Sequence, residues 1–161
     1  MDVDDALHPG PAPGTLLIPR AIHAAMVDHC RRDAPLECCG LLGGVPPRVT
    51  SIFPLRNALA SATRYTADSR DLIAAVQALR AQEARILAIY HSHPRWAAVP
   101  SRTDLAENHY GDVPRIIVSL LAEPPEVRVW RLDPDSYQEL PWHLVPDADE
   151  PVAVEPGDAP G

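Results

Sequence analysis

Apolar residues first recur at helical spacing soon after position 18. Pro19 follows the apolar stretch Leu16–Ile18, and the next apolar side chains stand four residues apart, at Ile22, Met26 and Cys30. Residues three and four apart share one face of a helix, and proline suits the first helical position. The pattern therefore predicts a helix from Pro19 to Arg32.

A second apolar stripe lies in the middle of the chain, at Leu72, Val76 and Leu79. This stripe predicts an amphipathic helix over residues 71–85. Asp68 or Ser69 precedes it, and either side chain can accept a hydrogen bond from the free backbone N–H groups of a first helical turn. We therefore expect one of these two residues to cap the helix.

The remaining apolar segments are short and bounded by glycine, proline or polar residues, which is typical of strands. Residues 36–44 predict a buried strand, and residues 49–55 predict its hairpin partner. The continuous apolar run 86–90 predicts a central strand, covered on both faces, that ends at His91. Further strands are expected over residues 115–121 and 127–132, and an edge strand over residues 138–145.

With a short helix opening near Ser101, the elements follow the order α-β-β-α-β-α-β-β. That order predicts the α/β class, with a mixed sheet in an α/β/α sandwich. A length of 161 residues fits one domain, which we place at residues 15–145. The flanking segments 1–14 and 146–161 are acidic and rich in proline, glycine and alanine, so they predict disordered ends.

The charge distribution argues against nucleic acid and membranes as partners. All 14 basic residues are arginines, and they lie between Arg20 and Arg131. The two ends hold eight of the 22 acidic residues, so the body between them has equal numbers of the two charges. A neutral body gives no electrostatic attraction for either partner. No apolar run reaches the ~18 residues of a membrane span, and the acidic start is unlike a secretion signal. We expect a cytoplasmic protein.

The three cysteines, Cys30, Cys38 and Cys39, do not form a CxxC pair. Their odd number and spacing predict neither a disulfide framework nor a four-thiolate zinc site. We expect reduced, mostly buried thiols. Cys38 and Cys39 are neighbours on a predicted strand, so they should point to opposite faces of the sheet.

Candidate chemistry is concentrated after the predicted central strand, in His91-Ser92-His93-Pro94 and, six residues later, Ser101-Arg102-Thr103-Asp104. Residues i and i+2 of a strand project from the same face, so the two imidazoles should emerge side by side. Asp104 would come from the first turn of the next helix. Two histidines and one carboxylate would leave the fourth position of a tetrahedral metal open for water, as a catalytic zinc requires.

Two further residues complete the candidate site. Glu37 lies within an apolar segment, and a buried carboxylate needs a partner such as a metal ion. It is the best candidate for the general acid/base, and Ser101 could donate to the oxygen of a tetrahedral intermediate. Taken alone, Ser101 and Asp104 match a helix capping box and the histidines could be ordinary core residues. The combination at this spacing favours a metal-dependent hydrolase.

These residues resemble the signature of the JAMM (MPN+) metalloprotease family, in which an upstream Glu is followed by His-x-His-Pro and Ser-x-x-Asp. The segment Glu37–Gly44 is also similar to the Glu-x-Cys-Gly opening of prokaryotic members. The resemblance implies a cytidine-deaminase-like α/β/α fold and one zinc ion held by His91, His93 and Asp104. It also implies Glu37 as general acid/base and Ser101 as oxyanion stabiliser.

The same resemblance implies a substrate class. Family members hydrolyse peptide or isopeptide bonds after the C-terminal tail of ubiquitin-like proteins, and short prokaryotic members look like partners of sulfur-carrier proteins. We therefore expect a carrier with a Gly-Gly C-terminus, whose extended tail could dock as an added strand. The identity of the carrier, the bond type and the oligomeric state stay open, and a homodimer is one option.

Three alternative functions make different demands on the sequence. A zinc deaminase of the related fold would need His-x-Glu and Pro-Cys-x-x-Cys, and the sequence has neither. An inactive scaffold of the same fold would typically have lost metal ligands, whereas this chain has all of them. A peptidase acting on small peptides stays compatible with the sequence.

Overall fold

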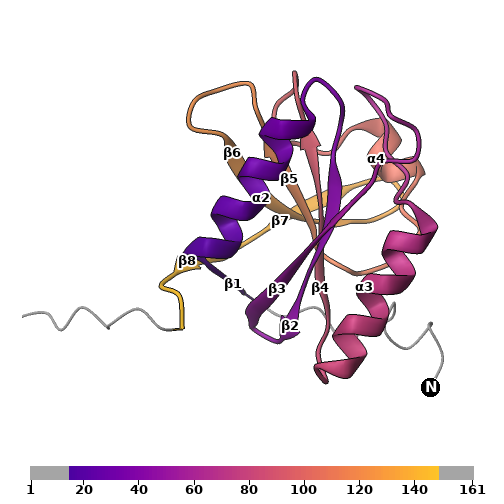
Figure 1. The fold of residues 1–161 in the computed structure, drawn as a ribbon. Coiled ribbons are helices and arrows are strands. Elements are labelled where there is room, and N and C mark those ends of the chain that lie inside the picture. Colours follow the sequence, from indigo (N-terminus) through magenta and orange to yellow (C-terminus); the bar gives the residue numbers. More distant parts are fainter. Residues whose placement is uncertain (1–14, 149–161) are drawn as a thin grey trace, which may run out of the picture.

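The computed structural model describes residues 15–148, which form one mixed sheet and three helices (Figure 1). Disorder is predicted for residues 1–14 and 146–161, and of these residues 1–14 and 149–161 lie outside the described residues. Residues 146–148 are described: the Pro146 carbonyl oxygen accepts from Arg48 Nη2 at 2.9 Å, and Asp147 Oδ1 accepts from the backbone N–H of Ala21 at 3.0 Å. In chain order the elements are β1 (Leu16–Pro19), α2 (Arg20–Asp33), β2 (Cys39–Val45), β3 (Arg48–Leu55), α3 (Ser69–Ala81), β4 (Arg85–His93), α4 (Arg102–Ala106), β5 (Arg115–Ser119), β6 (Glu126–Leu132), β7 (Tyr137–Leu140) and β8 (Trp142–Val145). No helix among the described residues is long and apolar enough to span a membrane.

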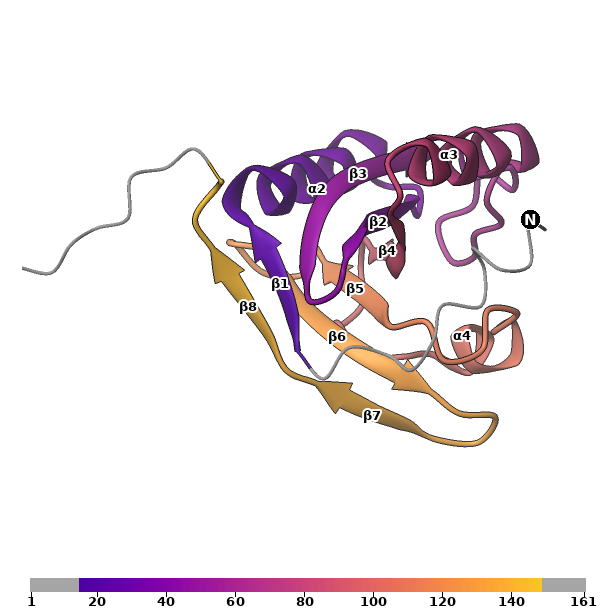
Figure 2. The same cartoon turned by 90° about the horizontal axis from the view of Figure 1, so that it is seen from below.

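The sheet has eight strands in the order β7-β6-β5-β4-β2-β3-β1-β8. Strand β4 lies at its middle, antiparallel to β2 and parallel to β5. Seen from below, the sheet curves, and β1 and β8 run side by side at one edge (Figure 2). The predicted mixed α/β class is confirmed.

Alternate residues of β4 face two hydrophobic clusters. Ala88 and Tyr90 belong to the cluster that includes Met26 of α2, and Ile89 belongs to the cluster that includes Leu79 of α3. The two helices therefore cover opposite faces of the central strands, as Figure 1 shows. This arrangement buries β4 on both sides, as its uninterrupted apolar sequence predicts.

The predicted helices are present, with shifted ends. Helix α2 ends at Asp33, one residue beyond the prediction, and Pro19 is its N-cap rather than its first residue. Helix α3 begins after Asp68, whose side chain accepts from two backbone N–H groups of the first turn. The prediction that α3 reaches residue 85 is wrong, because the helix ends at Ala81 and Arg85 already belongs to β4.

The observed strands differ more from the predicted ones than the helices do. Leu16–Pro19 forms β1, although no strand was expected there. Strand β2 begins at Cys39, so Glu37 precedes the strand instead of lying within it. The single edge strand predicted over 138–145 is two strands, β7 and β8, which lie at opposite edges of the sheet.

The predicted hairpin of β2 with β3 is confirmed.

The prediction of reduced, buried thiols is also confirmed, because all three cysteines are free and buried. Cys38 packs in the cluster beneath α2 and Cys39 in the cluster beneath α3, so the two neighbours do face opposite sides of the sheet.

Candidate metal centre

Two histidines of the central strand converge on one point. His91 and His93 both lie inside β4, whose end is three residues later than the apolar run alone predicts. Their relative exposures are 1% and 3%, and their Nε2 atoms lie 3.2 Å apart. The i, i+2 spacing therefore places both imidazoles on one face, as expected.

Hydrogen bonding and stacking fix the orientation of both rings. His93 Nδ1 lies 2.8 Å from the carbonyl oxygen of Ala97, so the N–H of the neutral ring is at Nδ1 and the lone pair of Nε2 points into the site. The Tyr65 ring stacks on the His91 ring with centroids 4.8 Å apart. Nε2 of His93 is thus prepared to act as an acceptor or ligand, whereas the buried Nδ1 of His91 has no hydrogen-bond partner among the described residues.

Asp104 completes this arrangement from helix α4. Its Oδ1 lies 3.1 Å from His91 Nε2, and its Oδ2 lies 3.2 Å from His93 Nε2. The backbone N–H of Ser101 donates to Oδ2 at 2.8 Å, and Ser101 Oγ accepts from the backbone N–H of Asp104 at 3.1 Å. The capping box is therefore present, and its acidic residue also contacts both histidines.

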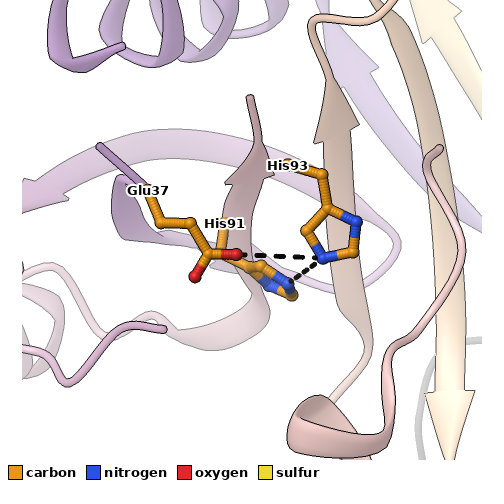
Figure 3. A group of neighbouring side chains, drawn as sticks. All are labelled: Glu37, His91 and His93. Carbon is orange, nitrogen blue, oxygen red and sulfur yellow. Dashed lines mark hydrogen bonds and ion pairs between the residues drawn. The ribbon is translucent and has the colours of Figure 1, made fainter. Parts of the chain in front are cut away.

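Glu37 is a second buried carboxylate next to His93. Its Oε1 lies 4.0 Å from His93 Nε2, and only 4% of the residue is exposed (Figure 3). Backbone contacts hold the segment in place: Glu37 N–H donates to the carbonyl oxygen of Ser61 at 2.8 Å, and Asn57 Nδ2 donates to the Glu37 carbonyl oxygen at 3.0 Å. Ser92 is the residue between His91 and His93 in the sequence, and its Oγ accepts a hydrogen bond from the backbone N–H of Cys38 at 2.9 Å.

The electrostatics of the site follow from burial and the short contacts. Burial raises the pKa of Glu37 to about 8, and the nearby Asp104 carboxylate adds to the effect. Burial lowers the pKa of His91. Burial opposes the ionisation of Asp104 as well, but its contacts with both histidines outweigh that and hold its pKa below the usual range.

The donor set suits a metal ion. One ligand atom each from Glu37, His91 and His93 lie within 4.8 Å of one another, and all three residues are buried. Asp104 adds a second carboxylate in contact with both imidazoles. Imidazole nitrogens and carboxylate oxygens are the ligands of open, catalytic metal sites in proteins.

Two cavities meet at this group. An inner cavity of about 160 Å³ is lined by Glu37, His91 and Asp104 and also by Tyr65 and Arg115. A more open cavity of about 420 Å³ is lined by Glu37, His93 and Ser101 and extends past Trp96. Glu37 lines both cavities, with His91 in the inner one and His93 in the open one.

The structure brings all five predicted residues together, and it adds residues that the sequence motif does not contain. Tyr65 supports His91, and Asn57 and Ser61 hold the backbone of Glu37. These contacts join separate segments, so no spacing in the sequence indicates them. Arg115 opens the predicted strand 115–121, and its burial beside the site is seen only in the structure.

Comparison with known proteins places these observations in a family. Residues 19–133 match the model of the prokaryotic homologs of the JAB domain. The chain is 35% identical over 125 residues to the CysO-cysteine peptidase of Mycobacterium tuberculosis, covering 75% of this chain and 85% of the relative. It is 39% identical over 103 residues to a probable TtuB-protein conjugate cleaving protease of Thermus thermophilus, covering 63% of this chain and 68% of the relative.

Solved structures agree with this match. A protein of Desulfitobacterium hafniense, with a solution structure, superposes with a TM-score of 0.77 at 27% identity, over 83% of this chain and 95% of that one. A JAB1/MPN domain protein from Archaeoglobus fulgidus superposes with a TM-score of 0.54 at 18% identity, over 80% of this chain and 98% of that one. The second match shows the fold alone.

Proposed function

The chain belongs to the family of prokaryotic homologs of the JAB domain, and from that premise we propose that it is a zinc-dependent protease of ubiquitin-like or sulfur-carrier proteins. It hydrolyses the peptide or isopeptide bond that follows the carrier's C-terminal Gly-Gly. The observation that carries the proposal is the close convergence of the two histidines and Asp104 beside a buried glutamate.

The interatomic distances support His91, His93 and Asp104 as the metal ligands. In a tetrahedral zinc site with bonds of 2.0–2.1 Å, neighbouring ligand atoms lie ~3.3 Å apart. The two Nε2 atoms lie 3.2 Å apart, and the Asp104 carboxylate lies 3.1 Å from His91 Nε2 through Oδ1 and 3.2 Å from His93 Nε2 through Oδ2. Glu37 Oε1, at 4.0 Å from His93 Nε2, is farther away. That separation suits a group that exchanges protons beside the metal rather than a ligand.

Bound by these residues, a zinc ion would act as a Lewis acid and lower the pKa of a coordinated water to about 7. Glu37 Oε1 would accept the proton of that water and later deliver it to the leaving nitrogen. In the metal-free chain, burial raises the pKa of this carboxyl to about 8, so Glu37 can hold a proton near neutral pH.

Ser101 is positioned to stabilise the developing oxyanion. Its Oγ already accepts from the backbone N–H of Asp104, so its own hydroxyl proton is free to donate. The side chain is exposed and lines the open cavity beside His93. A carbonyl oxygen that enters from that cavity would receive the hydroxyl hydrogen bond as negative charge forms.

Similarity to the two relatives supports the choice of substrate. One relative is named for CysO-cysteine and the other for TtuB-protein conjugates. A tail of two glycines suits the open cavity beside the histidines, because it presents backbone groups without side-chain bulk. We propose that the carrier tail occupies the open cavity beside Trp96 and Ser101.

The test is cleavage of CysO-cysteine and of a TtuB-protein conjugate by the purified protein, with zinc quantified in the same preparation. We expect one zinc per chain, loss of cleavage on chelation, and recovery when zinc is restored. Glu37→Gln should keep the zinc and lower the rate about 10²–10⁴-fold.

The other outcomes discriminate between functions. Zinc at one per chain without cleavage of either substrate, but with cleavage of short peptides, would identify a small-peptide peptidase. Absence of bound zinc would contradict the catalytic proposal and favour an inactive interaction scaffold.

A further inference from the structure

A buried arginine lines the inner cavity. Arg115 is the first residue of β5, and only 3% of it is exposed. It pairs with Ile89 across the parallel β4–β5 ladder, so its side chain is on the same face of the sheet as His91 and His93. Arginine is almost never buried to this extent unless it is paired with a counter-charge.

The neighbours of Arg115 are neutral. Its Nη2 donates to Asn108 Oδ1 at 2.6 Å, its Nη1 donates to the Tyr65 hydroxyl at 3.4 Å, and the guanidinium lies 5.1 Å from the centre of the Tyr110 ring. The buried Nε has no hydrogen-bond partner. Within residues 15–148, no carboxylate oxygen lies within 4.0 Å of the guanidinium. The cation is therefore buried without a counter-ion, which is costly unless a ligand provides one.

The acids that face the same cavity are engaged elsewhere. Asp104 contacts the two histidines, Glu37 Oε1 lies 4.0 Å from His93 Nε2, and Glu107 forms an ion pair with Arg64. Tyr65 links Arg115 to the metal centre, since its hydroxyl meets the guanidinium while its ring stacks on His91. The Tyr65 side chain thus connects the guanidinium of Arg115 to the ring of His91.

We propose that the inner cavity holds the leaving group, and that this group is a single amino acid whose free α-carboxylate pairs with Arg115. The inference rests on the proposed function and specifies its substrate. In a C-terminal amino acid the carboxylate is one carbon from the nitrogen of the scissile bond. In an isopeptide bond the lysine ε-nitrogen has no such neighbour. Arg115 therefore selects a peptide bond to a terminal residue over a protein–protein conjugate.

The size of the cavity supports a small leaving group. Its volume of about 160 Å³ is below the ~300–1,000 Å³ of pockets that take drug-sized ligands. Tyr65, Tyr110 and the guanidinium are among the groups that line it, and a space of this size suits a single amino-acid residue. An arginine fork also matches the two oxygens of a carboxylate.

The experiment compares two substrates that differ only at the terminal carboxyl. CysO is extended by one alanine, in one sample as the free acid and in the other as the carboxamide, and kcat/KM is measured with zinc-loaded wild-type protein. We expect the free acid to be cleaved at least tenfold faster, with the difference mainly in KM. Equal rates would overturn the inference and leave the proposed function standing.

Substitutions at Arg115 test whether this residue causes the preference for the free acid. Arg115→Gln should remove the preference for the free acid while zinc stoichiometry is unchanged, and Arg115→Lys should keep part of it. Arg64→Gln is the matched control, because Arg64 lines the same cavity but is exposed and already paired with Glu107. It should leave the preference as it is, and a loss as large as that of Arg115→Gln would argue against a specific role for Arg115.

A binding measurement decides the case in which neither CysO substrate is cleaved. N-acetylalanine and N-acetylalaninamide are titrated into the zinc-loaded protein while the Nε–H resonance of Arg115 is followed by NMR. A shift with the acid alone would support the carboxylate site even if CysO is the wrong carrier. No shift with either compound would overturn it.

Discussion

Asp104 Oδ1 lies 3.1 Å from His91 Nε2, and this contact joins the first turn of α4 to the middle of the sheet. The carboxylate receives a hydrogen bond from the N–H of Ser101 as well, so a short helix and the candidate metal centre are held by one side chain. Helix α4 has five residues, too few to be stable without such support.

Asp104→Asn should therefore weaken metal binding more than it disturbs the fold. The amide oxygen can still accept from Ser101 N–H, but the negative charge between the histidines is lost. We expect zinc affinity to fall about 100-fold or more, measured by competition with a chromophoric chelator. Glu107→Gln, which removes another carboxylate of the same cavity, should change the affinity little. Equal losses in the two variants would contradict Asp104 as a ligand.

The raised pKa of Glu37 predicts how the stability of the metal-free protein depends on pH. Burial moves this pKa from 4.5 to about 8, so the folded state holds a proton that the unfolded chain releases. The stabilisation by that proton is complete below about pH 4.5 and is lost as pH rises toward 8. With chelator present, the Tm of the wild type should drop by about 5 °C or more relative to Glu37→Gln between pH 5 and pH 8. Parallel Tm curves would show that Glu37 is ionised in the folded chain throughout.

Ser101 has two roles that variants can separate. As the N-cap of α4 it contributes about 1 kcal/mol of stability, and as an oxyanion donor it contributes to the rate. Ser101→Ala should lose both, with kcat down about 10²–10³-fold. Ser101→Asp keeps a capping oxygen but has no hydroxyl donor, so its stability should recover and its kcat should not. Ser101→Thr should retain most of both, and recovery of kcat in Ser101→Asp would rule out the donor role.

Gly40 of β2 leaves room for the ring of Tyr90 on the neighbouring strand β4. It pairs with Tyr90 across β2 and β4, and a Cβ at position 40 would overlap the Tyr90 ring. The ring is fully buried and its hydroxyl bonds His29 Nδ1 at 2.6 Å, so it cannot move aside. Gly40→Ala should cost about 1–3 kcal/mol of unfolding free energy, measured by urea denaturation.

Gly43→Ala is the matched comparison for that prediction. A Cβ there would meet the end of the Leu79 side chain, which can change rotamer. Its cost should be smaller than that of Gly40→Ala. The reverse order would mean that the Tyr90 ring is not fixed in place.

Local sequence signals predicted those parts of the fold that depend on local interactions. The stripe of α3 and its Asp68 cap predicted where that helix begins, but not where it ends. The segment after Ala81 has no glycine or proline to stop a helix. Glu83 nevertheless adopts a positive φ of 53°, which redirects the chain into β4. The pairing of β4 with β2 and β5, rather than helix propensity, sets that boundary.

The candidate site shows the same division. His91, His93, Ser101 and Asp104 follow from spacing, because a strand and a capped helix turn define where their side chains point. Tyr65 and Arg115 do not, since each reaches the site by packing against a segment far away in sequence. The motif therefore predicts the metal ligands and Ser101, whereas Tyr65 and the proposed carboxylate-binding residue Arg115 are found only from the structure.

The parallel pairing of β1 with β8 has a consequence for biosynthesis. Strand β1 is made before any other described element, but β3 pairs with it at only one register position and β8 at four. Its outer edge can therefore be covered only after Trp142–Val145 has left the ribosome. Until then Leu16–Pro19 is an open edge strand, and a chain stalled before residue 142 would expose it to other polypeptides. The sheet therefore gains its last edge strand only when Trp142–Val145 has emerged.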